Sequence, residues 1–451
     1  MPMHDVVGAR GKRSAAGARR LWHQGRAGAL AGAAVLLGVS FAVASAVPAQ
    51  AAHAPSTARA AATHPYRHGL VPMLGRGTTG SALTCSSKCL RYRGGNQGVG
   101  VTTGKEQVYL VFWGTQWGTQ GTNAQGYATF SGDPDGVAPD LQAFFDGLGS
   151  ATDKWSGVMT QYCQGVATGA TRCPSSAAHV AYPSGGALAG VWEDTSAASP
   201  ARSTGHQLAV EAEHAATHFG NTTTAANRNA QYVILSPTGT DPDSYLQQGF
   251  CAWHSYSGDS TLSGGGGAAG PLIAFTNMPY VPDAGSGCGA GFVNPGPLDG
   301  VTIVEGHEYA ETITDQNPAG GWTNFSNGEE VGDLCAWDSG PGAPAQDVTF
   351  GTGSFAVQSI WGNDGASGAG TCEISHPIVT NPGNTVTVTN PGNQTGTVGA
   401  AVSLQIHASD SASGQTLTYS ATGLPAGLSI NSSTGLISGT PTTAKIGRAH
   451  V

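Results

Sequence analysis

The chain has 451 residues, of which 10% are charged, and its formal net charge is −9. Residues 1–51 hold six of the 19 basic and one of the 28 acidic side chains, so the rest has 13 basic and 27 acidic residues, a net charge of −14. A chain this acidic, without a cluster of basic residues interleaved with aromatics, does not suit nucleic acid or anionic lipid. The composition therefore excludes both as expected partners.

The first 51 residues have the three parts of an export signal. Basic residues from Arg10 to Arg26 precede an apolar stretch at 27–47, and Ala49-Gln50-Ala51 is a small-x-small cleavage site. No later segment of the sequence is apolar over the length that a membrane span needs. We therefore expect a secreted, extracellular protein that is either released or associated with the cell wall.

Cysteine usage agrees with export. Eight cysteines in an exported chain predict four disulfides, and none of them forms the Cys-x-x-Cys pair of a cysteine-zinc or thioredoxin-like site. Their spacing favours pairing between neighbours, which is one of 105 connectivities. The predicted pairs are Cys85 with Cys89, Cys163 with Cys173, Cys251 with Cys288, and Cys335 with Cys372.

Composition and hydrophobic periodicity divide the chain after the export signal into a leader and a main domain. Residues 52–104 are rich in Ala, Thr, Gly and Arg and are predicted to be a disordered leader or pro-segment, whereas 105–376 are predicted to be the main domain. Strands are predicted at 107–113, 231–236 and 354–361, and helices at 140–148 and 205–219. The alternation of the two predicts an α/β or α+β fold with a mixed-sheet core flanked by helices.

Residues 299–315 read as a buried helix that nevertheless carries ionisable groups. At about 100° per residue, Glu311 lies about 40° and Asp315 about 80° from His307, within an apolar stripe. Burying an imidazole and a carboxylate costs several kcal/mol unless they pair or bind a cation. The pattern therefore predicts either a salt-bridged core or a metal site.

The spacing of this helix differs by one residue type from a known zinc device. His-Glu-x-x-His places two zinc ligands at i and i+4 with the Glu as general base, and a carboxylate is also a zinc ligand. His307-Glu308-x-x-Glu311 therefore predicts a zincin-like active helix, with His307 and Glu311 as metal ligands and Glu308 as the catalytic base. Glu330 or Asp333 is the predicted third ligand. The alternative is a buried His–Glu network that binds nothing.

Three further histidines have the spacing or setting of ligands. His214 and His218 form a second i, i+4 pair, which is a rival metal site, a source of a ligand for the first site, or a half-exposed helix face. His254 follows Cys251 closely and is interpreted either as a ligand or substrate-facing residue, or as a packed core histidine.

Residues 377–444 resemble the Ig-like, cadherin-like module that recurs in exported bacterial proteins, and they predict a small, truncated all-β unit. Such modules often bind calcium through Asp-x-Asp-x-Gly, but 410–414 read Asp-Ser-Ala-Ser-Gly and lack the second Asp. We therefore predict calcium binding at a loop that lacks one of the usual ligands. Residues 445–451 fit nothing before them and match what one frame of a sequencing adapter encodes, so we expect an assembly artefact there.

The region 107–365 resembles the EXORDIUM (phosphate-induced) family of exported proteins. The landmarks are the segments 108–114, 232–236, 250–254, 330–335 and 355–361, together with the His307-Glu308-x-x-Glu311 helix. The resemblance implies an extracellular, cell-wall-associated protein for which no biochemical activity is settled.

Two functions follow from these patterns. The first is a zinc-dependent extracellular hydrolase of peptidase type, acting on an extracellular protein, peptide or cell-wall polymer. The alternative is a non-catalytic wall protein in which the same residues form a structural ion site and the Ig-like module is an adhesive spacer. A serine hydrolase is not supported, because the chain has no Gly-x-Ser-x-Gly elbow. Glu308 and Glu330 would suit glycoside hydrolysis, but no sequence feature indicates a sugar cleft.

Overall fold

The computed structural model describes residues 65–75, 90–150, 152–265, 267, 270–338, 344–380, 386–392, 394–410 and 417–443. The predicted export signal, the first part of the predicted leader, the Cys85–Cys89 pair, the calcium loop at 411–414 and the segment 445–451 lie outside these residues. Among the described helices, none combines the length and apolar character that crossing a membrane requires.

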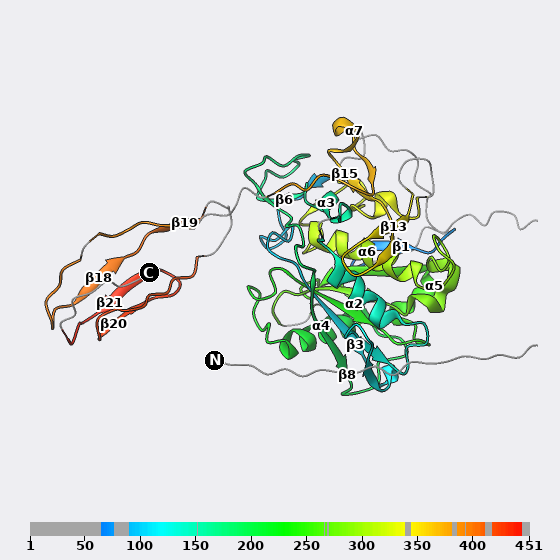
Figure 1. Ribbon diagram of the computed structural model, residues 1–451, viewed down its shortest axis with the longest axis horizontal. Helices are drawn as coiled ribbons and strands as arrows, with labels where there is room; N and C mark the ends of the chain where they lie inside the picture. The colour runs from blue at the N-terminus through cyan, green and yellow to red at the C-terminus, as the bar shows by residue number, and fades with distance from the viewer. Residues whose placement is uncertain are drawn as a thin grey trace, which may run out of the picture. The chain divides into compact units, whose positions relative to one another are not determined.

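A mixed sheet forms the centre of the main domain (Figure 1). Within the described residues it has six strands, in the order β1 (His68–Pro72), β10 (Phe250–Tyr256), β11 (Ala274–Met278), β9 (Ala230–Leu235), β3 (Gln107–Trp113) and β8 (Leu188–Asp194). Strands β11, β9, β3 and β8 are parallel, β10 runs antiparallel to β11, and β1 runs antiparallel to β10. The predicted mixed-sheet core is therefore present.

Helices cover both faces of this sheet. The helices are α2 (Val137–Gly147), α3 (Trp155–Met159), α4 (Gly205–His218), α5 (Tyr245–Gln248), α6 (Asp299–Thr314) and α7 (Gly365–Gly368). Alternate residues of a strand point to opposite faces, so Leu110 and Val233 join the core formed with α2, α3 and α6, whereas Val111 and Ile234 join the core formed with α4. The result is a sheet between two helical layers.

Hydrogen bonds from nearby side chains to the backbone determine where two of the helices begin. Helix α4 begins at a capping box, in which the Thr204 side chain and Gln207 bind each other's backbone N–H. Helix α2 starts earlier than predicted because the Asp133 carboxylate accepts hydrogen bonds from the N–H groups of Gly136, Val137 and Ala138.

Short pairs and 3₁₀ turns complete the domain. The pairs are β2 (Arg91–Tyr92) with β12 (Trp322–Thr323), β4 (Gln120–Thr122) with β5 (Ala128–Phe130), β6 (Cys163–Gln164) with β7 (Ala178–His179), β13 (Gln346–Thr349) with β14 (Ser354–Val357), and β15 (Ile360–Gly362) with β16 (Thr371–Glu373). The turns are η1 (Thr115–Trp117), η2 (Pro242–Ser244), η3 (Val281–Cys288) and η4 (Asp333–Cys335).

Three predicted features differ from the structure. The predicted leader contributes β1 to the main sheet and β2 to a smaller one, because both strands depend on pairing with distant residues that local composition does not reveal. The strand predicted at 354–361 is interrupted between β14 and β15 at Gln358 and Ser359. Residues 417–420 of the Ig-like module alternate between apolar and polar, which predicts a strand, but they form none.

The Ig-like module is all-β, as predicted. Strand β17 (Val386–Val388) pairs with β19 (Ala408–Asp410), and β21 (Leu436–Gly439) lies between β18 (Val402–Gln405) and β20 (Leu428–Ile430). Among its described apolar residues, Ile406, Ile437 and Pro441 are the buried ones, so its core is small.

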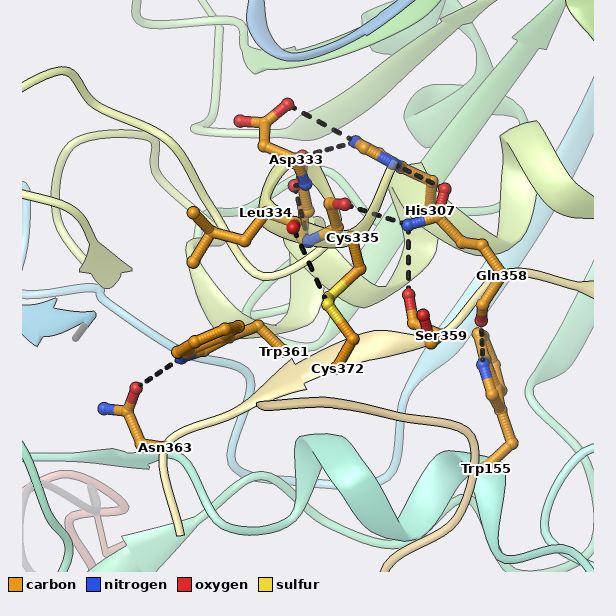
Figure 2. The surroundings of a disulfide bond; sticks show 12 residues. Trp155, His307, Asp333, Leu334, Cys335, Gln358, Ser359, Trp361, Asn363 and Cys372 are labelled. Carbon is orange, nitrogen blue, oxygen red and sulfur yellow. Dashed lines mark hydrogen bonds and ion pairs between the residues drawn. A yellow bond between two sulfur atoms is a disulfide. The ribbon is translucent and has the colours of Figure 1, made fainter. Parts of the chain in front are cut away.

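Three predicted disulfides are confirmed: Cys163–Cys173, Cys251–Cys288 and Cys335–Cys372. The last of them ties η4, which follows α6 in the chain, to β16 (Figure 2). It therefore fixes the turn that carries Asp333.

Candidate metal centre

Helix α6 is buried along its whole length. All sixteen of its residues are buried, and it contacts β10 and β11 of the sheet on one side and α2 and β14 on others. Its polar side chains therefore face protein rather than solvent. His307, Glu308 and Glu311 are completely buried, as the stripe analysis predicted for this segment.

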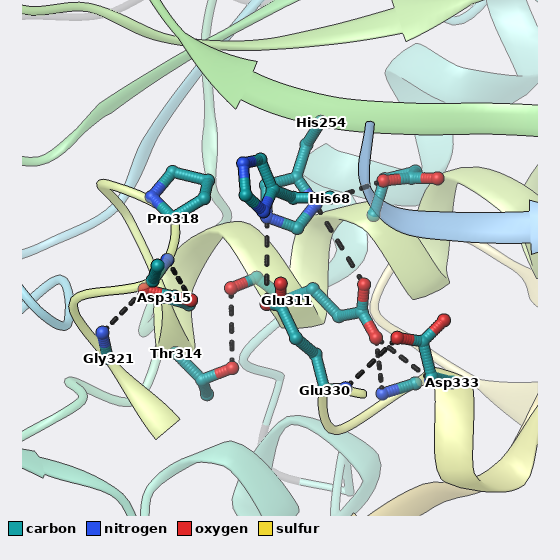
Figure 3. Close-up of polar contacts among 12 residues, drawn as sticks. His68, His254, Glu311, Thr314, Asp315, Pro318, Gly321, Glu330 and Asp333 are labelled. Carbon is teal, nitrogen blue, oxygen red and sulfur yellow. Dashed lines mark hydrogen bonds and ion pairs between the residues drawn. The ribbon is translucent and has the colours of Figure 1, made fainter. Parts of the chain in front are cut away.

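Two other segments bring ionisable groups to the same place (Figure 3). Strand β10 contributes His254, and the segment ending in η4 contributes Glu330 and Asp333. His254 is completely buried and Glu330 is 1% exposed, while the Asp333 side chain is 18% exposed. All four metal ligands predicted from the sequence therefore converge, together with His254.

The donor atoms form two groups that share Glu311. His307, Glu311 and Asp333 make one group, and His254, Glu311 and Glu330 the other, with the donor atoms of each group within 4.8 Å of one another. His307 Nε2 lies 3.2 Å from Glu311 Oε2 and 3.7 Å from Asp333 Oδ1. Ligands about 2.1 Å from a tetrahedral zinc lie roughly 3.4 Å apart, so these separations suit a bound ion.

Several of these donor atoms lack a hydrogen-bond partner among the described residues. They are His254 Nε2, His307 Nε2, Glu311 Oε2 and Glu330 Oε2. His307 Nε2 and Glu311 Oε2 are near each other, but their alignment does not make a hydrogen bond. A buried polar atom without a partner costs about 1–3 kcal/mol. A cation between them would compensate this cost, so the residues present fit a metal.

Gln358 sets the orientation and tautomer of His307. Its amide nitrogen donates to the carbonyls of Gly332 (2.9 Å) and Ser359 (3.2 Å), so its oxygen is the atom 3.1 Å from His307 Nδ1. An oxygen accepts, which places the proton of a neutral His307 on Nδ1 and leaves the Nε2 lone pair free toward Glu311. The interruption between β14 and β15 thus provides a supporting residue.

Glu311 is held in a similar way. Its Oε1 accepts hydrogen bonds from the N–H groups of Gly332 (2.8 Å) and Asp333 (2.9 Å), so Oε2 is the oxygen left toward the histidines. A Cβ on Gly332 would lie 2.7 Å from His307 Nδ1, so this close approach needs glycine. Backbone and side chain together preorganise one carboxylate oxygen.

The electrostatics favour a cation. Burial raises the pKa of Glu308 and Glu330 well above the usual value, and the neighbouring carboxylates add to it. Burial and Glu311 raise the pKa of Asp333 to about 8. Burial alone lowers the pKa of His307, but Glu311 and Asp333 outweigh it and raise the pKa to about 9. Without a metal, protons must therefore balance the clustered carboxylates.

No lysine or arginine in the described part of the chain forms an ion pair with these carboxylates. The described arginine ion pairs involve Asp243, Asp364 and Asp241 instead. A salt-bridged core neutralised by a basic side chain is therefore not what the structure contains. Within the cluster His307 is the cationic partner, because burial, together with His68 and His307, lowers the pKa of His254 well below its usual value.

Glu308 lies beside the donor groups without belonging to either of them. Its Oε2 is 3.2 Å from His254 Nδ1, and its Oε1 has no hydrogen-bond partner among the described residues. A carboxyl in this setting can hold or release a proton next to the donor atoms, which is what a general base requires.

Asp315 has a structural role. Its carboxylate accepts hydrogen bonds from the N–H groups of Ala319, Gly320 and Gly321, which closes the turn after α6. Asp315 is not in either donor group.

Of the rival histidine pair, only His214 joins a donor group among the described residues, together with Asp194 and Glu211. His214 has a side chain 62% exposed and lies 3.5 Å from Glu211, with Asp194 near. His218 stacks on Trp192 with ring centroids 4.4 Å apart, and it belongs to no donor group among the described residues.

His254 and Gln358 are site residues whose roles the sequence left open or missed. All seven residues of β10 are buried, so periodicity could not distinguish the face on which His254 lies. Its proximity to Cys251 was the available signal. No local signal marks Gln358, because its partner is 51 residues away.

Comparison with protein families assigns the C-terminal module. The family described as "Putative Ig domain" matches residues 384–451, in agreement with the Ig-like unit expected there. Searches of the curated proteins and of the solved structures found no match for this chain.

Proposed function

We propose that this protein is a zinc-dependent hydrolase that cleaves peptide bonds outside the cell. His307, Glu311 and Asp333 would hold the metal, with His254 and Glu330 beside them. The observation that carries the proposal is the convergence of buried, unpartnered nitrogen and oxygen atoms from α6, β10 and the η4 segment. Nitrogen and carboxylate oxygen are ligands that zinc accepts.

The residues have distinct tasks in this mechanism. When bound there, zinc would supply Lewis-acid chemistry and make water a nucleophile near neutral pH. Glu308 accepts the proton released from the attacking water and passes it to the leaving amine. His254, 3.2 Å from Glu308, orients that carboxyl. Gln358 keeps the His307 proton on Nδ1, and the N–H groups of Gly332 and Asp333 hold Glu311.

The test is peptide turnover by the full chain with and without a chelator. Glu308→Gln should lower turnover by about 10²–10⁴-fold while the protein still binds zinc. Glu305→Gln is the matched control, because Glu305 is also a completely buried carboxyl of α6 but belongs to neither donor group. Full turnover in Glu308→Gln, or turnover unaffected by chelation, would contradict the proposal.

A second candidate is a non-catalytic extracellular protein in which the ion is structural and the Ig-like module mediates adhesion. The burial of His254, His307 and Glu311 favours it, because a catalytic ion needs access for substrate. The resemblance of 107–365 to the EXORDIUM family and the three disulfides agree with a wall-associated location. Zinc that raises the melting temperature, without peptide turnover in any variant, would favour this candidate.

A further inference from the structure

Strand β1 covers the candidate metal centre. It pairs antiparallel with β10, the strand that carries His254, with His68 opposite His254 and Val71 opposite Ala252. It also contacts α6, which carries His307 and Glu311, and η4, which carries Asp333. A short segment from far upstream in the sequence therefore forms the edge of the sheet and lies against β10 beside the site (Figure 3).

Gly69 is the point of closest approach. The register between β1 and β10 shifts between His68 and Val71, so the chain bulges at Gly69, which has φ 55°. A Cβ at this position would lie 1.8 Å from Glu311 Oε2 and 2.7 Å from His254 Nδ1. The main chain of β1 thus passes directly over the shared metal-ligand atom, and any side chain there would collide with it.

Both ends of the segment are anchored. At one end, Arg67 Nε donates to Asp243 Oδ2 over 2.6 Å, and its guanidinium lies 4.7 Å from the centre of the Phe250 ring. Asp243 and the next residue, Ser244, have φ of 51° and 60°. Non-glycine residues rarely adopt this conformation, so the turn that presents the Asp243 carboxylate is strained.

The other anchor consists of hydrogen bonds that involve the main chain of the segment itself. Trp337 Nε1 donates to the carbonyl of Pro72 over 2.6 Å, and the N–H groups of Met73 and Leu74 donate to the carbonyls of Gly249 and Gly287. Such contacts recognise an extended backbone rather than a particular side chain. Between the two anchors, the segment runs in the manner of a peptide added to a sheet edge.

We propose that residues 66–74 occupy the position of an extended peptide substrate and keep the site latent. The substrate class is an extended polypeptide that pairs with β10 in place of β1, with glycine at the position of Gly69. This inference rests on the proposed function, because it concerns access to the same site. No covalent step is involved: the anchors at Asp243 and Trp337 must release before a substrate strand can pair.

The test weakens one anchor in the full chain and measures access to the metal. In Arg67→Ala, a chelator should remove zinc at least tenfold faster than from the wild type. Arg172→Ala is the matched control, because Arg172 makes an exposed ion pair with Asp364, and it should match the wild type. Equal removal rates in all three proteins would overturn the inference.

Hydrogen exchange separates failure of this inference from failure of the proposed function. In Arg67→Ala, amides of β1 and of the facing edge of β10 should exchange at least tenfold faster, with β9 and β3 unchanged, whether or not the protein binds zinc or cleaves peptides. Faster exchange throughout the sheet would identify β1 as an integral strand and overturn the inference. Absence of zinc binding with selective exchange in β1 would instead reject the metal.

A peptide competitor tests the substrate class. The peptide Pro-Tyr-Arg-His-Gly-Leu-Val-Pro-Met-Leu-Gly, which copies residues 65–75, should slow zinc removal from Arg67→Ala at least fivefold. The same peptide with alanine in place of its first glycine should have no effect, because its Cβ would meet Glu311 Oε2. Equal protection by both peptides would contradict the requirement for glycine.

Discussion

Helices α4 and α6 carry ligand-type residues at the same spacing but place them in opposite environments. On α4, His214 is largely exposed and His218 stacks on an aromatic ring. On α6, His307 and Glu311 are completely buried and face donor atoms from two other segments that have no hydrogen-bond partner in the described part of the chain. An i, i+4 pair is therefore not a site by itself. Asp194 also approaches His214, but that histidine is exposed, whereas the donors around α6 are almost all buried.

The largest expected effect tests the difference between α6 and α4 by removing Glu311, the carboxylate that both α6 donor groups share. Glu311→Ala should lower the free energy of unfolding of the metal-free protein by about 3–5 kcal/mol, because it leaves His307 and two backbone N–H groups without their partner. His218→Ala should cost about 1 kcal/mol or less, the loss of one stacked pair. Chemical denaturation measures both. Similar losses in the two variants would mean that the α6 cluster is no more demanding than the α4 pair.

A smaller effect tests whether Gln358 supports metal binding through its contact with His307. Gln358→Leu removes the acceptor of the His307 Nδ1 proton and should weaken zinc binding by about 10–100-fold. Gln358→Glu retains an acceptor oxygen and should recover part of that affinity. Competition titration with a chelator of known affinity measures the change. Unchanged affinity in Gln358→Leu would show that His307 does not need this contact to bind metal.

The smallest effect is a pH-dependent change in the free energy of unfolding that arises from Glu211 on α4. Burial and then Asp194 raise the pKa of Glu211 to about 8, above the 4.5 of the unfolded chain. A carboxyl with a raised folded pKa loses stability as the pH rises between these values, because the unfolded state releases its proton first. Glu211→Gln should therefore gain on the order of 1 kcal/mol relative to the wild type between pH 5 and pH 8. Unfolding at several pH values tests this, and a constant difference would contradict it.

Local patterns predicted the elements whose stability is encoded locally. The apolar run of β3, the capped helix α4 and the buried stripe of α6 were all evident from the sequence. Neighbour pairing of cysteines also held for three bridges, because each joins segments that lie close along the chain.

The remaining features depend on contacts between distant residues. Strand β1 is five residues long and derives its structure from pairing with β10, about 180 residues away, so its composition resembled a leader. His254 reaches the site through the register of β10 with β11, which no local period encodes. The sequence identified His307, Glu308 and Glu311 on one helix, but not the strand that covers them.

The most direct test of the account is the metal content of the purified full chain, determined by elemental analysis after incubation with zinc and removal of excess ion. The account predicts one zinc per chain in the wild type and in His214→Ala, and none in Glu311→Gln, which keeps the hydrogen-bonding oxygen but loses the charge. A wild-type protein that folds and retains no zinc would contradict it. The buried cluster would then be held together by shared protons alone.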